Sequence, residues 1–130
     1  MPIKVLLADD TELIRRAIRR ILSGHPEIEL VGEAQDFAQV IQMKSELQPE
    51  VIVMDLYMPN ENNIPVERLK QELNEESKLV AISVWVDEDA KSLAQRLGAF
   101  KLLDKMDVGH NLIPTIFDSV GHQGSSAALA

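Results

Sequence analysis

The 130-residue sequence predicts a doubly wound α/β domain, in which helices cover both faces of a five-stranded parallel sheet. Three observations predict this class. Apolar runs of strand length recur at residues 3–8, 28–31, 51–54, 79–83 and 100–103. Segments with the apolar spacing of amphipathic helices follow these runs. The central runs are apolar on both faces, as expected for parallel strands buried between two helical layers.

The first helix is predicted over residues 11–22, where an apolar stripe lies opposite a basic face. The stripe comprises Leu13, Ile14, Ala17, Ile18, Ile21 and Leu22, and the basic face comprises Arg15, Arg16, Arg19 and Arg20. We expect Gly24 to end this helix. A second helix is predicted to begin at Asp36, because its carboxylate can cap the helix. Gln39, three residues later, can supply the reciprocal hydrogen bond of a capping box. Pro49 stops this second helix.

Three further helices are predicted, and the first of them has a weaker pattern. The third follows a polar turn at residues 60–63, and its apolar positions are Ile64, Val66, Leu69 and Leu73. The fourth starts near Asp87 and ends at Gly98, a good left-handed terminator. The fifth contains Pro114, which we expect within the first turn because proline disrupts a helix interior.

Composition limits the functions open to the chain. The net charge of −8, from 21 acidic and 13 basic residues, argues against direct binding to nucleic acid or an anionic membrane. The absence of cysteine excludes disulfides and thiolate metal sites. The start turns acidic too soon for a signal peptide, and no apolar run reaches membrane-spanning length. We expect a cytoplasmic protein with one domain over residues 1–120, followed at 121–130 by a flexible linker or a non-native tail.

Polar residues follow four of the predicted strands at equivalent positions. Asp9 and Asp10 follow the first strand, Asp55 follows the third, Ser83 closes the fourth and Lys105 comes just after the fifth. In open parallel sheets, sites form outside the carboxyl ends of the strands. We therefore expect these five residues to meet at one edge of the sheet.

Three neighbouring carboxylates repel one another unless a cation lies among them. Oxygen ligands suit a hard ion such as Mg²⁺, and the three histidines, His25, His110 and His122, show no metal-ligand spacing. A metal, a lysine and a hydroxyl around one carboxylate are the parts needed for phosphoryl transfer to that carboxylate. Asp55 would then form an acyl phosphate, and Ser83 would hydrogen-bond a phosphoryl oxygen that is absent before transfer.

In these residues and in the Asp55-Leu-Tyr-Met-Pro59 segment, the chain resembles the receiver domain of two-component response regulators over roughly residues 3–120. The resemblance implies the flavodoxin-like strand order 2-1-3-4-5. It implies that Asp55 accepts a phosphoryl group from a sensor histidine kinase or a phosphotransfer protein. Mg²⁺ would be bound by the carboxylates of Asp10 and Asp55 and the main-chain carbonyl of Tyr57, with Asp9 acting through water. Ser83 would be the switch hydroxyl, and Lys105 would pair with the phosphoryl group.

The resemblance also implies a signalling domain rather than an enzyme, with only self-phosphorylation and self-dephosphorylation chemistry. The first-helix pattern DDTELIRRAIRRIL is similar to receivers attached to helix-turn-helix transcription factors of the nitrate-responsive type, which implies a transcriptional output. In the family this helix lies near the kinase-docking surface, so Arg15, Arg16 and Arg19 are candidate docking residues. Homodimerisation on phosphorylation is a further expectation.

The chain departs from the family pattern at three places. Leu102 stands where a Tyr or Phe usually precedes the lysine by three residues, and Phe100 is the neighbouring aromatic. Leu102 is therefore the candidate switch position. Met106 follows the lysine in place of the usual Pro, and asparagines replace the usual glycine after Pro59.

Three other functions share parts of this pattern. A pseudo-receiver would keep the fold as a phosphorylation-independent interaction module. A haloacid-dehalogenase-like phosphatase also places a nucleophilic Asp after an apolar strand, but it needs a second Asp at the position of Tyr57. A flavin-binding flavodoxin-like domain would bring phosphate against Asp9 and Asp10, which would repel it.

Overall fold

The computed structural model describes residues 1–121, and the predicted tail therefore lies, except for Gly121, outside the described residues. Strands and helices alternate along the chain. In order they are β1 Ile3–Ala8, α1 Glu12–Ser23, β2 Ile28–Ala34, α2 Phe37–Leu47, β3 Val51–Asp55, α3 Val66–Asn74, β4 Lys78–Ser83, α4 Glu88–Arg96, β5 Lys101–Asp104, the short 3-10 helix η1 Lys105–Asp107, and α5 Val108–Ser119. Within residues 1–121, no helix is long and apolar enough to cross a membrane.

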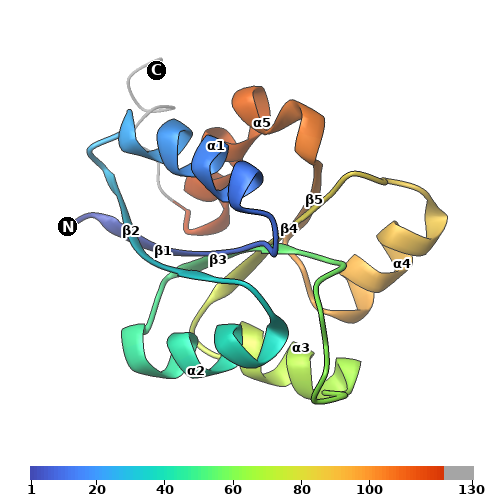
Figure 1. The fold of residues 1–130 in the computed structure, drawn as a ribbon. Helices are drawn as coiled ribbons and strands as arrows, with labels where there is room; N and C mark the ends of the chain where they lie inside the picture. Colours follow the sequence, from blue (N-terminus) through green and yellow to red (C-terminus); the bar gives the residue numbers. More distant parts are fainter. Residues whose placement is uncertain (122–130) are drawn as a thin grey trace.

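The five strands form one parallel sheet in the order β2-β1-β3-β4-β5, which confirms the predicted class and strand order. Helices α1 and α5 cover one face, and α2, α3 and α4 cover the other (Figure 1). The sheet divides the core into two apolar clusters. Leu6, Ile52 and Leu79 belong to the cluster beneath α2, α3 and α4, whereas their neighbours Val53 and Val80 belong to the cluster beneath α1 and α5.

Side-chain caps fix two of the helix starts. The Asp36 carboxylate accepts from the Gln39 N–H at 2.8 Å, and the Gln39 amide oxygen accepts from the Gln35 N–H at 2.8 Å. Asp87 accepts from the Ala90 N–H at 2.9 Å at the start of α4. Both starts agree with the sequence, because short acidic side chains satisfy backbone donors that a helix leaves open.

Helix α1 differs from its predicted faces. Leu13 is 69% exposed and Ala17 is also exposed, whereas Arg15 is only 7% exposed. The expectation that Arg15 lies on the exposed basic face is therefore wrong. Its guanidinium is buried because it contacts Glu33 of β2 and the main-chain carbonyl of Asp9. A buried charge is stable when such partners take up its hydrogen bonds.

Helix α5 begins at Val108, so Pro114 lies in the helix interior and the expectation of a first-turn proline is wrong. A proline within a helix leaves the carbonyl four residues earlier without its donor. Here that carbonyl belongs to His110, and both His110 and Pro114 are exposed. Water can therefore satisfy the carbonyl, which lowers the cost of the interruption.

Two strands differ from the predictions in their bounds. Strand β2 extends to Ala34, three residues beyond the expected end at Val31. Strand β5 starts at Lys101, and Phe100 lies just before it with about half of its surface exposed. The longer β2 brings Glu33 into register with Leu7 of β1, close to where β1 ends.

Candidate functional site

Three carboxylates meet at the carboxyl edge of the sheet. Asp9 and Asp10 follow β1, and Asp55 is the last residue of the neighbouring strand β3. Each offers one carboxylate oxygen, and these three oxygens all lie within 4.8 Å of one another. Asp9 and Asp55 are buried, while Asp10 is exposed. The structure thus brings together the three acids that the sequence predicted to meet at the carboxyl edge of the sheet.

Lys105 joins this cluster from the other side. The residue begins η1, directly after β5, and its side chain is largely buried. Its Nζ lies 2.5 Å from Asp9 Oδ2 and 3.1 Å from Asp55 Oδ2. Burial lowers the pKa of Lys105, but its contacts with Asp9 and Asp55 outweigh burial, so the pKa lies above its ordinary value. The lysine is therefore a permanent cation between two acids.

Asp9 is held on several sides. Its backbone N–H donates to the Ala34 carbonyl at 3.0 Å, and its Oδ1 accepts from the Thr11 N–H at 2.8 Å. Its Oδ2 is buried and makes no hydrogen bond, although the Lys105 ammonium lies 2.5 Å away as an ion-pair partner. The lysine therefore compensates the charge of the buried Asp9 carboxylate.

Asp55 combines burial with a fixed orientation. Its Oδ1 accepts from the Tyr57 N–H at 3.0 Å. Burial raises the pKa of the Asp55 carboxyl above its ordinary value, while the Tyr57 N–H and the Lys105 ammonium act in the opposite direction. A carboxylate that burial disfavours gains more from a further cation than an exposed one does.

The cluster fits a hard divalent cation by its donor set. All three side chains offer carboxylate oxygens, and no histidine or cysteine takes part. The exposed Asp10 carboxylate makes no hydrogen bond or ion pair within residues 1–121, and the buried Asp9 Oδ2 makes no hydrogen bond. Oxygen donors of this kind, partly open to water, suit Mg²⁺ better than a soft metal.

Ser83 is the last residue of β4 and is fully buried. It lies in register with Asp104, the residue before Lys105. Its Oγ accepts from the Trp85 N–H at 3.0 Å, and no residue among 1–121 accepts the hydroxyl proton. The Ser83 hydroxyl proton is therefore available to donate a further hydrogen bond at the edge of the sheet.

Exposed apolar side chains lie on the segments that follow the carboxyl ends of three strands, the edge that carries the acids. The β4–α4 loop contributes Val84, Trp85 and Val86, the β3–α3 loop contributes Tyr57, and η1 contributes Met106. Trp85 is 64% exposed and Met106 is 83% exposed. The place of Trp85 two residues past Ser83 predicts from the sequence that it lies near the site, whereas Val84, Val86 and Met106 were not predicted there, because single apolar residues outside regular elements carry no periodic signal.

The other candidate residues lie further from the acids. Leu102 is half-buried in β5 and packs against the apolar cluster beneath α4. Phe100 lies at the opposite end of β5 from Lys105, so it does not stand in for the missing aromatic at this edge. Arg16 is exposed on α1, and Arg19 pairs with Glu33 through Nε at 2.7 Å. Glu33 was not predicted from the sequence, because a single acid near the end of a strand carries no periodic signal.

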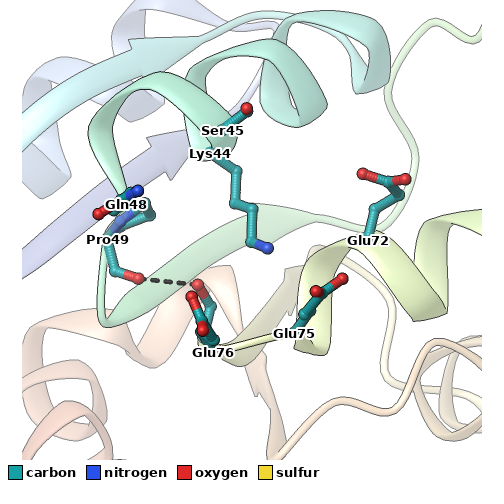
Figure 2. A pocket seen from close by; sticks show the side chains of 8 residues that line it. Lys44, Ser45, Gln48, Pro49, Glu72, Glu75 and Glu76 are labelled. Carbon is teal, nitrogen blue, oxygen red and sulfur yellow. Dashed lines mark hydrogen bonds between the residues drawn. The ribbon is translucent and has the colours of Figure 1, made fainter.

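A hollow of about 400 Å³ lies between the end of α2 and the end of α3. Figure 2 shows Lys44 and the glutamates Glu72, Glu75 and Glu76 around it. Its one buried polar side chain, Ser77, is satisfied because its Oγ donates to the Pro49 carbonyl at 2.7 Å. These segments precede β3 and β4, so the hollow lies at the amino edge of the sheet and is separate from the acidic cluster.

Comparison with known proteins gives one consistent result. A model of the response regulator receiver domain matches residues 5–116. The chain is 38% identical over 106 residues to a protein-glutamate methylesterase/protein-glutamine glutaminase of Syntrophomonas wolfei, covering 79% of this chain and 30% of that protein. It is 36% identical over 105 residues to the transcriptional regulatory protein LiaR of Bacillus subtilis, covering 79% of this chain and 49% of LiaR. The chain thus spans half or less of the length of these relatives.

Solved structures agree on the fold. The response regulator domain of Thermotoga maritima CheB superimposes with a TM-score of 0.80 at 25% identity, covering 93% of this chain and 98% of that one. The signal receiver domain of a putative NarL from Mycobacterium tuberculosis gives a TM-score of 0.79 at 22% identity, covering 90% and 94%. With five parallel strands in the order 2-1-3-4-5, the acidic edge and the match over residues 5–116, the chain belongs to the response regulator receiver domain family.

Proposed function

We propose that Asp55 accepts a phosphoryl group in a Mg²⁺-dependent step, from a sensor histidine kinase or a phosphotransfer protein. Receiver domains are signalling modules that bind Mg²⁺ at an acidic pocket. The observation that carries the proposal is the position of Lys105, whose ammonium contacts both Asp9 and Asp55 beside the exposed Asp10. A buried carboxylate beside a fixed cation, at an edge open to solvent, is suited to receive an anionic group.

The residues divide the chemistry among them. A carboxylate oxygen of Asp55 attacks the phosphorus in line, the bond between phosphorus and the donor breaks, and the donor leaves with its electron pair. The Tyr57 N–H orients Asp55 through its 3.0 Å bond to Oδ1. Lys105 neutralises charge on the transferred group, and the Ser83 hydroxyl donates its unused proton to a phosphoryl oxygen. Asp10, Asp55 and the Tyr57 carbonyl would hold Mg²⁺, with Asp9 acting through water, and the ion would neutralise charge on the phosphoryl oxygens.

Incubation with acetyl phosphate and Mg²⁺, followed by intact-mass analysis, tests this proposal. We expect wild type to gain the mass of one phosphoryl group and Asp55→Asn to gain none. Asp118→Asn is the matched control, because Asp118 is an exposed acid on α5, away from the acidic edge. An adduct that persists in Asp55→Asn would contradict the assignment of the acceptor.

Two rival functions predict different results in the same assay. A pseudo-receiver would form no adduct and would not bind beryllium fluoride, the phosphoryl analogue. A haloacid-dehalogenase-like phosphatase would release phosphate repeatedly, but Tyr57 stands where that chemistry needs a second acid. The acids and Lys105 in contact favour the phosphoacceptor over both.

The output of the whole protein is proposed as transcriptional. Relatives named as transcriptional regulators, LiaR of Bacillus subtilis and DegU of Brevibacillus brevis, support this output, while the methylesterase relatives represent the enzymatic alternative. In the proposed cycle, phosphorylation shifts the face of α4, β5 and α5 toward partner binding or homodimerisation in the cytoplasm. Mass photometry or light scattering with and without beryllium fluoride would detect the dimer.

A further inference from the structure

Arg15 is buried beside the acidic cluster and uses three nitrogens of its guanidinium. Nη1 donates to the Asp9 carbonyl at 2.7 Å, Nε donates to Glu33 Oε1 at 3.2 Å, and Nη2 pairs with Glu12 Oε2 at 2.5 Å. Its side chain is 8% exposed. The two glutamates compensate its charge, and its remaining contact goes to the main chain of a residue in the acidic cluster.

The carbonyl that Arg15 holds belongs to the peptide that joins Asp9 to Asp10. A peptide unit is planar, so a hydrogen bond to its oxygen also fixes the N–H and Cα of Asp10. The exposed Asp10 carboxylate makes no hydrogen bond or ion pair of its own within residues 1–121. The position of this carboxylate therefore depends on the main chain that carries it.

We propose that Arg15 is a positioning residue for the Mg²⁺ site, acting through the Asp9–Asp10 peptide. The inference rests on the proposed function, in which Asp10 is a ligand of the ion. With the Asp9 carbonyl held, the free protein already presents Asp10 in the orientation required for binding. Without this bond, the peptide must be ordered when the ion binds, which weakens the affinity. Partners that orient metal ligands typically account for about 10–100-fold in metal affinity.

Arg19 provides a matched comparison on the same helix. Its Nε and Nη2 donate to Glu33 at 2.7 and 2.9 Å, and its Nη2 lies 3.6 Å from Glu12. Arg19 thus shares both glutamates with Arg15 but makes no contact with the Asp9 carbonyl. Arg19→Met removes the same charge from the same network and leaves the Asp9–Asp10 peptide bonded to Arg15.

Isothermal titration calorimetry with MgCl₂ on the 130-residue protein tests the proposal. We expect the Mg²⁺ dissociation constant to rise about tenfold in Arg15→Met and to stay at the wild-type value in Arg19→Met. The rate of phosphorylation by acetyl phosphate at saturating Mg²⁺ should be unchanged in Arg15→Met, because Arg15 does not touch the reacting atoms. A defect that only destabilised the fold would not separate affinity from rate in this way.

Arg15→Lys serves as a second variant should Arg15→Met fail to fold. A lysine keeps the positive charge but lacks the planar fork, so the two glutamates compete with the carbonyl for one ammonium. We expect weaker Mg²⁺ binding here too. A folded Arg15 variant with wild-type affinity, or equal weakening in Arg19→Met, would overturn the inference. If wild type itself binds no Mg²⁺, the proposed function fails first, and the site that Arg15 would position does not exist.

Discussion

The Lys105 ammonium lies 2.5 Å from Asp9 Oδ2, and the same Nζ reaches Asp55 Oδ2 at 3.1 Å. A single cation thus compensates two carboxylates at the carboxyl ends of two neighbouring strands, Asp9 directly after β1 and Asp55 as the last residue of β3. When both acids are ionised, the trio still carries one negative charge, and Asp10 adds another. This excess of negative charge at a partly open edge is the electrostatic reason why a divalent cation fits there.

Removal of the shared cation should weaken the fold. Lys105→Met leaves two buried carboxylates without their cation, and we expect the free energy of unfolding to fall by about 3 kcal/mol. Urea unfolding without Mg²⁺ measures this. Lys101→Met is the control, because Lys101 is exposed and makes no ion pair within residues 1–121. Equal stability of the two variants would show that Lys105 does not compensate the acids.

Neutralisation of the proposed acceptor should have the opposite effect. Burial raises the pKa of the Asp55 carboxyl in the folded protein above its ordinary value of 3.8. As the pH rises, this carboxyl therefore loses its proton at a lower pH in the unfolded state than in the folded state. Asp55 thus supports the fold below its unfolded pKa and loses that contribution as the pH rises through the higher folded pKa. We expect Asp55→Asn without Mg²⁺ to be more stable at neutral pH by on the order of 1 kcal/mol. The gain should shrink as the pH falls toward 3.8.

Urea unfolding of both proteins across this pH range, with EDTA present, measures the difference. Asp118→Asn again provides the control, because it removes an exposed acid on α5. A gain that does not change with pH would contradict titration of Asp55 as its source.

Ser83→Ala should separate binding of the phosphoryl group from binding of the metal. The alanine removes the hydroxyl proposed to donate to a phosphoryl oxygen after transfer, and it also removes the acceptor of the Trp85 N–H, which lies on an exposed loop where water can replace that acceptor. We expect beryllium fluoride to bind about tenfold more weakly, the loss of roughly one hydrogen bond to a charged group, with the Mg²⁺ dissociation constant unchanged. Calorimetry measures both constants. Unchanged beryllium fluoride affinity would exclude Ser83 as a phosphoryl ligand.

Pro114→Ala should stabilise the protein away from the site. Alanine restores the donor for the His110 carbonyl within α5, and we expect a gain of about 2 kcal/mol after allowance for the more flexible unfolded chain. Chemical unfolding measures the gain, with the exposed Asn111→Ala in the same helix as control. A loss of stability would mean that the proline ring packs better than its exposure indicates.

The sequence predicted those features that depend on nearby residues. Asp36 and Asp87 begin helices because their carboxylates cap backbone donors three residues later. The acidic edge was also predictable, because parallel strands end on the same side and place Asp9 and Asp55 together. Neither inference needs any knowledge of how the helices pack.

The features that the sequence did not predict depend on distant partners. A helical wheel assigns every arginine to the solvent, but Arg15 is buried because Glu33, eighteen residues later, extends from β2 to meet it. Leu13 is exposed because the buried side of α1 is the side that carries Arg15, and Leu13 does not lie on it. Pro114 is compatible with the helix interior because it lies on the solvent-facing side of α5. No local sequence pattern reveals which side of the helix faces solvent at this position.

The bond from the Trp85 N–H to Ser83 Oγ ties the only tryptophan of the sequence to the hydroxyl expected to hold the phosphoryl group. A phosphoryl oxygen that accepts the Ser83 proton would therefore lie one hydroxyl group away from the backbone of the exposed indole. We therefore expect stopped-flow fluorescence of the unlabelled protein to follow capture and loss of the phosphoryl group in real time.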